Sequence, residues 1–366
     1  MNKNSIYRFI FAGGGTGGHL YPAIAVAQQI RSEIPGAQIL FVGAKNKIES
    51  KVVPQYGFEF RAIWISGFSR KFTLENLLFP IKVVVALFQS LIIVMKYKPR
   101  VAIGSGAYVS GPVIWAASIF GSKIILLEQN SYPGITNRLL EKKAEEIHLT
   151  FEESKKYFRV QNRLYVTGNP IRIDMKLIDR NVAVERFGFN NSNKVLLIIG
   201  GSGGAGSINN AVAASLDSLV ELGVQVIWQT GKNYYNTFKD LNRDHVKVRA
   251  FIDNMTDAYS AADLVVARAG ATTIAEVSYL GLPVIFVPST NVAANHQYMN
   301  AKALCESNAA IMIEDINLSN EFFNKIKEII FNKEKTTELK KNISVFAKPD
   351  AGKVIAGRAI HLAKIP

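Results

Sequence analysis

Two glycine-rich segments, one in each half of the chain, most constrain its fold. Residues 13–19 read GGGTGGH and residues 200–207 read GGSGGAGS, and each follows an apolar run and precedes a helical stretch. Such a turn lets backbone N–H groups approach a phosphate closely, and the helix adds the positive end of its dipole. We therefore expect two similar α/β domains that face a shared cleft, with an anionic, nucleotide-like ligand between them.

Short apolar runs alternate with helical stretches along both halves, which is typical of parallel βαβ units. Strands are expected at residues 7–12, 38–42, 100–103, 123–127, 146–150, 163–167, 194–199, 225–230, 247–251, 264–267 and 283–287. A polar, lysine-rich helix is expected at 320–341. We place the domain boundary at Arg172, so that residues 1–172 form the first domain and 173–349 the second. A last helix, at about 350–366, is expected to pack back on the first domain.

The charge of the chain is uneven. Its net charge of +14 comes mostly from residues 1–170, which hold 21 Lys and Arg against 10 Asp and Glu; the remainder holds 22 against 19. A basic first half is compatible with nucleic acid, an anionic membrane surface or an acidic substrate, and charge alone does not choose among them. Cys305 is the only cysteine, which fits a reducing compartment.

An apolar stretch at residues 77–95, LLFPIKVVVALFQSLIIVM, is nearly long enough to span a bilayer. Polar or helix-breaking residues interrupt it, and a central lysine is costly in hydrocarbon, so a transmembrane span is disfavoured. The interrupting residues are Pro80, Lys82, Gln89 and Ser90, and the basic flanks are Arg70, Lys71, Lys96, Lys98 and Arg100. Two interpretations stay open: a buried helix with a basic rim, or an apolar helix that rests on anionic lipid headgroups.

Both glycine loops match G-x-G-x-x-G, but a dinucleotide cofactor also needs an acidic residue at the end of the next strand. Those strands run into Gly43-Ala44-Lys45 and Thr230-Gly231-Lys232, and no Walker lysine follows either loop. Hydride transfer and nucleotide hydrolysis are therefore disfavoured. The sequence also lacks a Cys/His cluster, an H-E-x-x-H motif and an Asp-x-Asp motif, so no metal and no cofactor is expected.

Polar residues at predicted strand ends are the candidates for chemistry. His19 closes the first loop and is either a general base or a capping residue. Ser202 in the second loop is placed to meet a phosphate. Asn130 follows the strand at 123–127 and either binds a sugar or begins a turn. Arg172 lies at the presumed hinge, where an inter-domain salt bridge would also explain it.

The block at residues 268–276, RAGATTIAE, is the densest polar segment. Thr273 and Glu276 have capping-box spacing, but a carboxylate in the first turn of that helix could also take two ribose hydroxyls. Residues 291–300, which include His296, Gln297 and Asn300, are expected to form a polar loop that opens a helix. The repetition of such features at strand ends in both halves indicates a nucleotide-sugar site.

Taken together, these segments resemble the MurG family of peptidoglycan glycosyltransferases over essentially the full chain. The matching stretches are GGGTGGHLYPA (13–23), GSGAYVSGP (104–112), EQNSYPGITNRLL (128–140), VTGNPIR (166–172), GGSGGAGS (200–207), RAGATTIAE (268–276), GLPVIFVPS (281–289) and NHQYMNA (295–301). The sequence departs from the family pattern at Gly203, where Gln is common, and at Leu127, where His is frequent.

The resemblance implies a GT-B fold, with two Rossmann-like domains and the active site in the cleft between them. It implies transfer of N-acetylglucosamine (GlcNAc) from UDP-GlcNAc to the C4 hydroxyl of the undecaprenyl-linked muramyl pentapeptide, lipid I. The product would be lipid II, formed with inversion at the sugar carbon. It also implies a peripheral protein on the cytoplasmic face of the bacterial inner membrane, which it meets through residues 68–100. Other cell-wall synthesis proteins are possible partners, and nucleic acid is not expected.

The resemblance also implies roles for particular residues. His19 would be the base or would orient the acceptor, and Arg172 would help to hold the donor. Thr16, Gly17 and Gly18 would shape the site beneath the sugar and the acceptor diphosphate. The remaining donor contacts would be Asn130 on GlcNAc, Ser202 on a phosphate, the Ile252 backbone on uracil, Ala271 and Thr272 at a helix start, Glu276 on the ribose and Gln297 on the sugar hydroxyls.

Three alternatives remain open. Another GT-B lipid glycosyltransferase, acting on diacylglycerol, would share the fold and the membrane contact. A dinucleotide-dependent oxidoreductase is weakened by the missing acidic residues. A nucleic-acid-binding protein would fit the charge, but no recognisable reader motif supports it.

Overall fold

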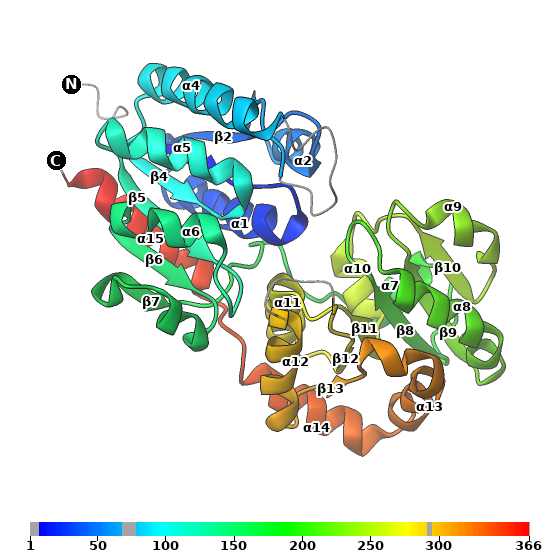
Figure 1. The fold of residues 1–366 in the computed structure, drawn as a ribbon. Helices are drawn as coiled ribbons and strands as arrows, with labels where there is room; N and C mark the ends of the chain where they lie inside the picture. The colour runs from blue at the N-terminus through cyan, green and yellow to red at the C-terminus, as the bar shows by residue number, and fades with distance from the viewer. Residues whose placement is uncertain (1–6, 68–77, 291–294, 366) are drawn as a thin grey trace. The chain divides into compact units, whose positions relative to one another are not determined.

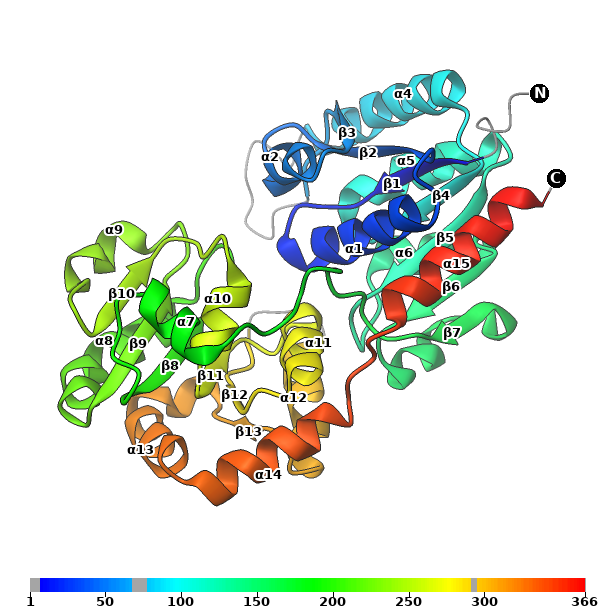
Figure 2. The same cartoon turned by 180° about the vertical axis from the view of Figure 1, so that it is seen from behind.

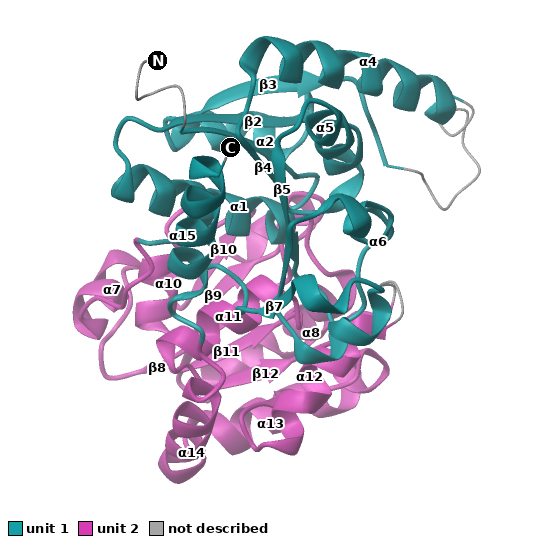
Figure 3. Ribbon diagram, turned by 90° about the vertical axis from the view of Figure 1, so that its left-hand side faces the viewer, with its two compact units in different colours: residues 1–173, 348–366 teal, residues 174–347 magenta. Residues whose placement is uncertain are grey.

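The computed structural model describes residues 7–67, 78–290 and 295–365. The chain divides into two compact units, coloured separately in Figure 3. Unit 1 comprises residues 1–173 and 348–366, and unit 2 comprises residues 174–347. Each unit is a parallel sheet with helices on its faces, so the α/β prediction with two parallel sheets is confirmed.

Unit 1 contains a seven-stranded parallel sheet in the order β3-β2-β1-β4-β5-β6-β7 (Figure 1). Its strands are β1 (Arg8–Ala12), β2 (Gln38–Ala44), β3 (Glu59–Ile63), β4 (Val101–Gly104), β5 (Lys123–Glu128), β6 (Glu146–Leu149) and β7 (Leu164–Val166). Its helices are α1 (Gly17–Glu33), α2 (Ile48–Gln55), α4 (Phe79–Tyr97), α5 (Ala107–Ile119), α6 (Ile135–Leu140) and α15 (Ala351–Lys364).

Both faces of this sheet are buried, which explains its continuous apolar runs. Along β1, Phe9 and Phe11 point into one core with α1 and α15, whereas Ile10 and Ala12 point into a second core with α4 and α5. This is the two-residue period of a strand. Figure 2 shows the C-terminal helix α15 beside α1, on which it packs through Ile355 and its neighbours.

Unit 2 contains a six-stranded parallel sheet in the order β10-β9-β8-β11-β12-β13. Its strands are β8 (Lys194–Ile199), β9 (Val224–Gln229), β10 (Val246–Arg249), β11 (Leu264–Ala267), β12 (Val284–Phe286) and β13 (Ile311–Met312). Its helices are α7 (Arg180–Arg186), α8 (Gly206–Glu221), α9 (Tyr235–Phe238), α10 (Met255–Ala261), α11 (Ala271–Leu280), α12 (His296–Glu306), α13 (Leu318–Ile330) and α14 (Lys333–Ser344).

All the strands predicted from the sequence are present, but the single helix predicted at 320–341 is wrong. The chain forms two helices there, α13 and α14, which are separated at Phe331 and Asn332. Asn332 has an extended backbone, and its side chain accepts a hydrogen bond from the Lys335 N–H, so it caps a new helix. The edge strands β3 and β13 were not predicted, because β3 carries charged residues and β13 has two residues.

Helix α4 buries Lys82 and Ser90 together with Ala86 and Val94, and exposes a row of large apolar side chains. Lys82 is buried and donates to Ser66 Oγ at 3.0 Å, and Gln89 accepts from the Trp64 N–H at 2.7 Å. Its exposed side chains include Ile81, Val84, Phe88, Ile92 and Met95. The buried-helix interpretation is therefore wrong. Among the described residues, α4 is the one helix long and apolar enough to cross a membrane, which is weak evidence for a span.

Candidate functional site

The first glycine loop brings His19 to the carboxyl edge of the unit 1 sheet. α1 begins at Gly17, so His19 lies in its first turn. Its Nδ1 lies 2.8 Å from the carbonyl oxygen of Ser105 and 2.9 Å from Oε1 of Gln129. Because a carbonyl can only accept, this pattern assigns the proton of the neutral ring to Nδ1 and leaves a lone pair on Nε2. The half-buried imidazole is therefore arranged to accept a proton.

The loops after β4 and β5 are built around this histidine. Gly106, with φ of +89°, has no Cβ, and a Cβ there would lie 3.0 Å from His19 Nδ1. A larger residue would therefore be strained and would push the imidazole away from its partners. Gln129 is buried directly after β5, whose carboxyl end lies on the same sheet edge as that of β1.

Asn130 is held at this edge by the buried carboxylate of Glu128. One carboxylate oxygen accepts from the Asn130 backbone at 2.9 Å and from its side-chain amide at 3.1 Å. The other accepts from Gly134 N at 3.0 Å and from Asn137 Nδ2 at 2.8 Å. Glu128 thus fixes the loop that carries Asn130, a role that the sequence did not assign to it.

The three small residues before His19 lie at the start of α1. Thr16 is the N-cap and has an extended backbone, but its hydroxyl does not cap the helix. Thr16 and Gly18 are exposed, and Gly17 is half-buried. The start of the helix is therefore open to a ligand at these positions.

Arg172 belongs to unit 1, near the end of its first segment. Its Nη1 donates to the Tyr56 hydroxyl at 3.2 Å, and its guanidinium is 5.5 Å from the centre of the Tyr21 ring. Since Tyr21 belongs to α1, Arg172 is positioned next to the helix that carries His19.

In unit 2, the second glycine loop connects β8 to α8. Gly204, with φ of +87°, passes so close to the next strand that a Cβ would lie 2.1 Å from the Thr230 carbonyl oxygen. Ser202 is half-buried, and its carbonyl accepts from Lys232 N at 3.3 Å. The loop is thus packed against residues 230–232, and Ser202 lies four residues before the first residue of α8, Gly206.

Gln229 joins the second glycine loop to the segment after β10. Its Nε2 donates to the Gly201 carbonyl at 3.3 Å, and its Oε1 accepts from Ile252 N at 2.8 Å. The N–H of Ile252 is therefore used within the protein. The backbone of Ile252 can offer its carbonyl oxygen, rather than its N–H, to a ligand.

The capping-box interpretation of Thr273 and Glu276 is wrong. α11 begins at Ala271, after the extended N-cap Gly270, so Thr273 lies inside the helix and Glu276 lies in its second turn. The expectation of a first-turn carboxylate is wrong for the same reason. Glu276 is buried, and its Oε2 accepts from the Tyr259 hydroxyl of α10 at 2.8 Å.

Other donor-site candidates lie at the starts of α11 and α12. Ala271 is buried and Thr272 is half-buried in the first turn of α11. Gln297 was expected in a polar loop, but it lies in the first turn of α12, and its Oε1 accepts from Ser289 N at 2.9 Å. Residues 291–294 of the predicted loop lie outside the described residues.

Arg268 forms a hub that the sequence did not reveal. It directly follows β11, and its guanidinium donates to Asp315 Oδ1 at 2.6 Å, to Ser207 Oγ at 2.8 Å and to the Val287 carbonyl at 3.1 Å. Its partners are far apart in sequence, and the arginine at the strand end was the one available signal. The hub fixes the start of α8 beside the second glycine loop.

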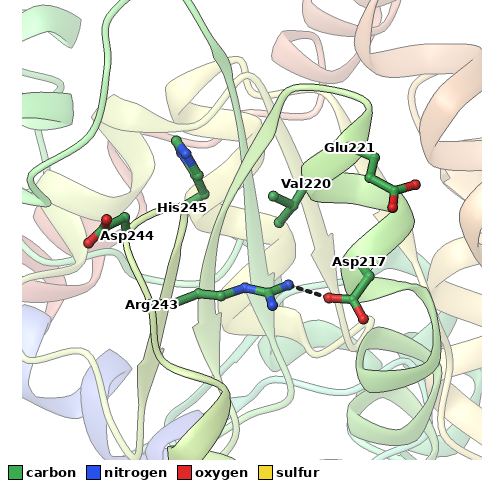
Figure 4. A pocket seen from close by; sticks show the side chains of 6 residues that line it. All are labelled: Asp217, Val220, Glu221, Arg243, Asp244 and His245. Carbon is green, nitrogen blue, oxygen red and sulfur yellow. Dashed lines mark hydrogen bonds and ion pairs between the residues drawn. The ribbon is translucent and has the colours of Figure 1, made fainter.

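A separate pocket in unit 2 lies at the opposite edge of the sheet (Figure 4). It is lined by Asp217, Val220, Glu221, Arg243, Asp244 and His245. These residues precede β9 and β10, whereas ligands of parallel α/β sheets bind at the carboxyl ends of strands. The pocket is therefore not the candidate site. Within residues 7–67, 78–290 and 295–365, no group of three His, Cys, Asp or Glu could hold a metal ion.

Comparison with known proteins identifies both halves of the chain. The glycosyltransferase family 28 N-terminal domain matches residues 9–149, and the family 28 C-terminal domain matches residues 195–355. Each match includes one of the two glycine-rich loops. The family match therefore extends over both parallel sheets.

Relatives of similar length carry one name. The chain is 44% identical to the UDP-N-acetylglucosamine--N-acetylmuramyl-(pentapeptide) pyrophosphoryl-undecaprenol N-acetylglucosamine transferase of Flavobacterium psychrophilum, over 97% of this chain and 98% of the relative. It is 42% identical to the protein of that name from Cytophaga hutchinsonii, over 99% and 98%. The crystal structure of MurG from Acinetobacter baumannii matches with a TM-score of 0.70 and 26% identity, over 96% and 98%. The GT-B prediction is thereby confirmed, and the chain belongs to the MurG family of glycosyltransferase family 28.

Proposed function

We propose that this protein transfers GlcNAc from UDP-GlcNAc to the C4 hydroxyl of lipid I and forms lipid II with inversion at the sugar carbon. Family membership supports the reaction, because the relatives named above carry it in their names. One observation supports the chemistry most directly. Nδ1 of His19 is engaged with the Ser105 carbonyl, so that Nε2 can accept the proton of the acceptor hydroxyl.

The reaction is a single displacement. The C4 oxygen of the acceptor attacks the anomeric carbon of GlcNAc from the face opposite the diphosphate, and the bond from that carbon to the β-phosphate oxygen breaks. The hydroxyl proton passes to His19 Nε2, and UDP leaves with the bonding electron pair. Ser202 and the N-terminal end of α8 would stabilise the charge that develops on the leaving diphosphate.

The donor contacts that we propose are those of the family resemblance, and at Ile252 and Gln297 a hydrogen bond within the protein determines which atom would face the ligand. The Ile252 carbonyl would accept from uracil N3–H, since its N–H is already bonded to Gln229. Gln297 would donate through Nε2 to the sugar, because its Oε1 is bonded to Ser289 N. The remaining contacts would be Glu276 on the ribose hydroxyls, Ala271 and Thr272 at the start of α11, Asn130 on GlcNAc and Arg172 on the donor.

On the acceptor side, we assign the open start of α1 to the acceptor sugar and diphosphate. Thr16, Gly17 and Gly18 line this position, and Thr16 has a hydroxyl that the helix does not use as a cap. An N-terminal helix end favours an anion, which fits the diphosphate of lipid I.

Helix α4 supports a peripheral position on the cytoplasmic face of the bacterial inner membrane. Its outward face is apolar, with Phe88 66% exposed, and its inward polar residues are bonded to the protein. Lys96 and Lys98 are exposed at its C-terminal end. An apolar face beside basic residues favours adsorption to anionic headgroups, as an acceptor with an undecaprenyl chain requires.

The test is transfer of radiolabelled GlcNAc from UDP-GlcNAc to a lipid I analogue, with diacylglycerol as a parallel acceptor. We expect label in the lipid I product alone. Transfer to diacylglycerol alone would support UDP-GlcNAc as the donor but contradict lipid I as the acceptor. Absence of transfer to either lipid, in protein that binds UDP-GlcNAc, would overturn the proposed reaction.

A further inference from the structure

Glu49 is a buried carboxylate that links the first glycine loop to the neighbouring strand. It lies in α2 and is 1% exposed. Its Oε2 accepts from Gly15 N at 2.8 Å, and its Oε1 accepts from Ala44 N at the end of β2 at 2.9 Å. Each carboxylate oxygen therefore binds the backbone of a different segment, which compensates for removing the charge from water.

Two glycines leave the space that this carboxylate occupies. A Cβ on Gly14 would lie 2.4 Å from the Glu49 carboxyl carbon, and a Cβ on Gly43 would lie 2.4 Å from its Cγ. Neither distance is possible without displacing Glu49. These two glycines are thus explained by an internal carboxylate rather than by a ligand phosphate.

The same contact changes how the first loop can be used. The N–H of Gly15 points to Glu49 and is not available to a substrate anion. The second partner of Glu49, the Ala44 N–H, holds the carboxylate at the end of β2. The register of β2 is fixed by its pairing with β1 and not by the glycine loop. The loop is therefore held from the protein side, directly before the helix that carries His19.

We propose that Glu49 is a positioning residue that fixes the first glycine loop and thereby the catalytic orientation of His19. The effect on turnover rests on the proposed function, whereas the effect on the loop does not. A displacement of catalytic groups by about 1 Å can cost on the order of 100-fold in rate. The donor contacts proposed above belong to unit 2, apart from Asn130 and Arg172, so loss of Glu49 should change donor affinity little.

The test compares Glu49→Gln with Glu59→Gln, which changes an exposed carboxylate of the same unit that pairs with Arg61. The Gln side chain keeps the shape of Glu, but its NH2 group would face one of the two backbone N–H groups. One of the two hydrogen bonds is then lost, because both groups are donors. We expect kcat for GlcNAc transfer to fall at least about tenfold in Glu49→Gln, with Kd for UDP-GlcNAc within about twofold. In protein labelled with 15N-glycine, the Gly15 amide resonance should move in Glu49→Gln and stay in place in Glu59→Gln.

Gly43→Ala provides a second variant should Glu49→Gln not fold. It pushes on Glu49 from β2 without altering the carboxylate or the glycine loop, although its Cβ would also lie 2.9 Å from Phe60. It should likewise shift the Gly15 resonance and lower kcat. An unmoved Gly15 resonance, or unchanged kcat in a folded variant with wild-type transfer intact, would overturn the inference. If wild-type protein transfers no GlcNAc, the proposed function fails, and the Gly15 resonance still decides the positioning role.

Discussion

At His19, the partner of one ring nitrogen determines what the other can do. The Ser105 carbonyl holds the proton on Nδ1, so the basic nitrogen is Nε2. A capping histidine would instead use its ring on the backbone of its own helix. The contacts to Ser105 and Gln129, from two other strand ends, favour the catalytic interpretation.

The first prediction is that His19→Ala lowers kcat by about 100-fold or more while Kd for UDP-GlcNAc changes less than about threefold. The physical reason is loss of the proposed proton acceptor, with all the proposed donor contacts unchanged. Steady-state kinetics and calorimetric binding measure the two quantities. His245→Ala, in the pocket at the opposite sheet edge of unit 2, is the matched control. Turnover of His19→Ala within threefold of wild type would remove His19 from catalysis.

Glu276 offers a second residue-scale prediction, because the capping alternative has been eliminated. Glu276→Ala should raise Kd for UDP-GlcNAc about tenfold. The reason is that the two proposed hydrogen bonds to the ribose together contribute on the order of 1 kcal/mol to the binding free energy. Tyr259→Phe removes the hydroxyl that Glu276 accepts from but keeps the carboxylate, so it should weaken binding less than threefold. Equal losses in the two variants, measured by calorimetry, would indicate a structural role for Glu276.

Some of these residues could be predicted from the sequence and others could not. His19, Asn130 and Ser202 lie in the segments that follow predicted strands, so the alternation of strands and helices already predicts that they lie near carboxyl edges. Glu49 could not be found in this way, because its partner Gly15 is 34 residues away and nothing local marks the contact. Arg268 is similar, since Asp315 lies 47 residues further along the chain.

At the scale of elements, α4 departs most from what its composition suggested. In the sequence, the four residues that interrupt the apolar stretch only argued against a membrane span. In the structure, Lys82 and Ser90 are buried against unit 1 together with Ala86, whereas Val84 and Phe88 are exposed. Hydrophobic composition could not reveal this, because the direction of a helix face is set by its tertiary partners. The break between α13 and α14 was also missed, because Asn332, the N-cap of α14, lies within a stretch whose composition is helical throughout.

A third prediction concerns α4 and anionic vesicles. Phe88→Glu should lower the partition coefficient at least about tenfold, because it removes an apolar side chain worth about 1.5–3 kcal/mol and adds a repelled charge. Val345→Glu makes the same kind of change at a 77%-exposed apolar site of unit 2 and should have little effect. Vesicle sedimentation measures the partitioning. Equal loss in both variants, or none in Phe88→Glu, would contradict membrane contact through α4.

At the scale of the whole molecule, the C-terminal helix α15 packs in unit 1 and completes the core that the N-terminal part of the chain begins. An ion pair between Arg358 of α15 and Glu146 of β6 fixes this helix, and His148 Nε2 lies 3.1 Å from the same carboxylate. Burial alone would raise the pKa of Glu146, but hydrogen bonds from His148 and Arg358 lower it to about 2. Sequence analysis predicted a C-terminal helix near these positions and could not predict this pair, which spans 212 residues.

The fourth prediction is a pH dependence of stability. The folded pKa of Glu146 lies below its ordinary value of 4.5, so the pair stabilises the protein above about pH 4.5 and loses that contribution as the pH falls toward 2. Because Arg358 is partly exposed, we expect the pair to contribute on the order of 1–2 kcal/mol to the free energy of unfolding above pH 4.5. Arg358→Met should flatten the pH dependence in urea unfolding, and Arg61→Met, at an exposed pair, should not. An unchanged slope in Arg358→Met would contradict this role.

The most direct test of the proposed reaction is the anomeric configuration of the disaccharide formed from UDP-GlcNAc and a lipid I analogue. UDP-GlcNAc carries an α-linked sugar, and one in-line displacement with a base inverts that centre. Proton NMR of the product should therefore show a β linkage to the C4 oxygen of the muramyl sugar. An α linkage, attachment at another hydroxyl, or no disaccharide would contradict the account.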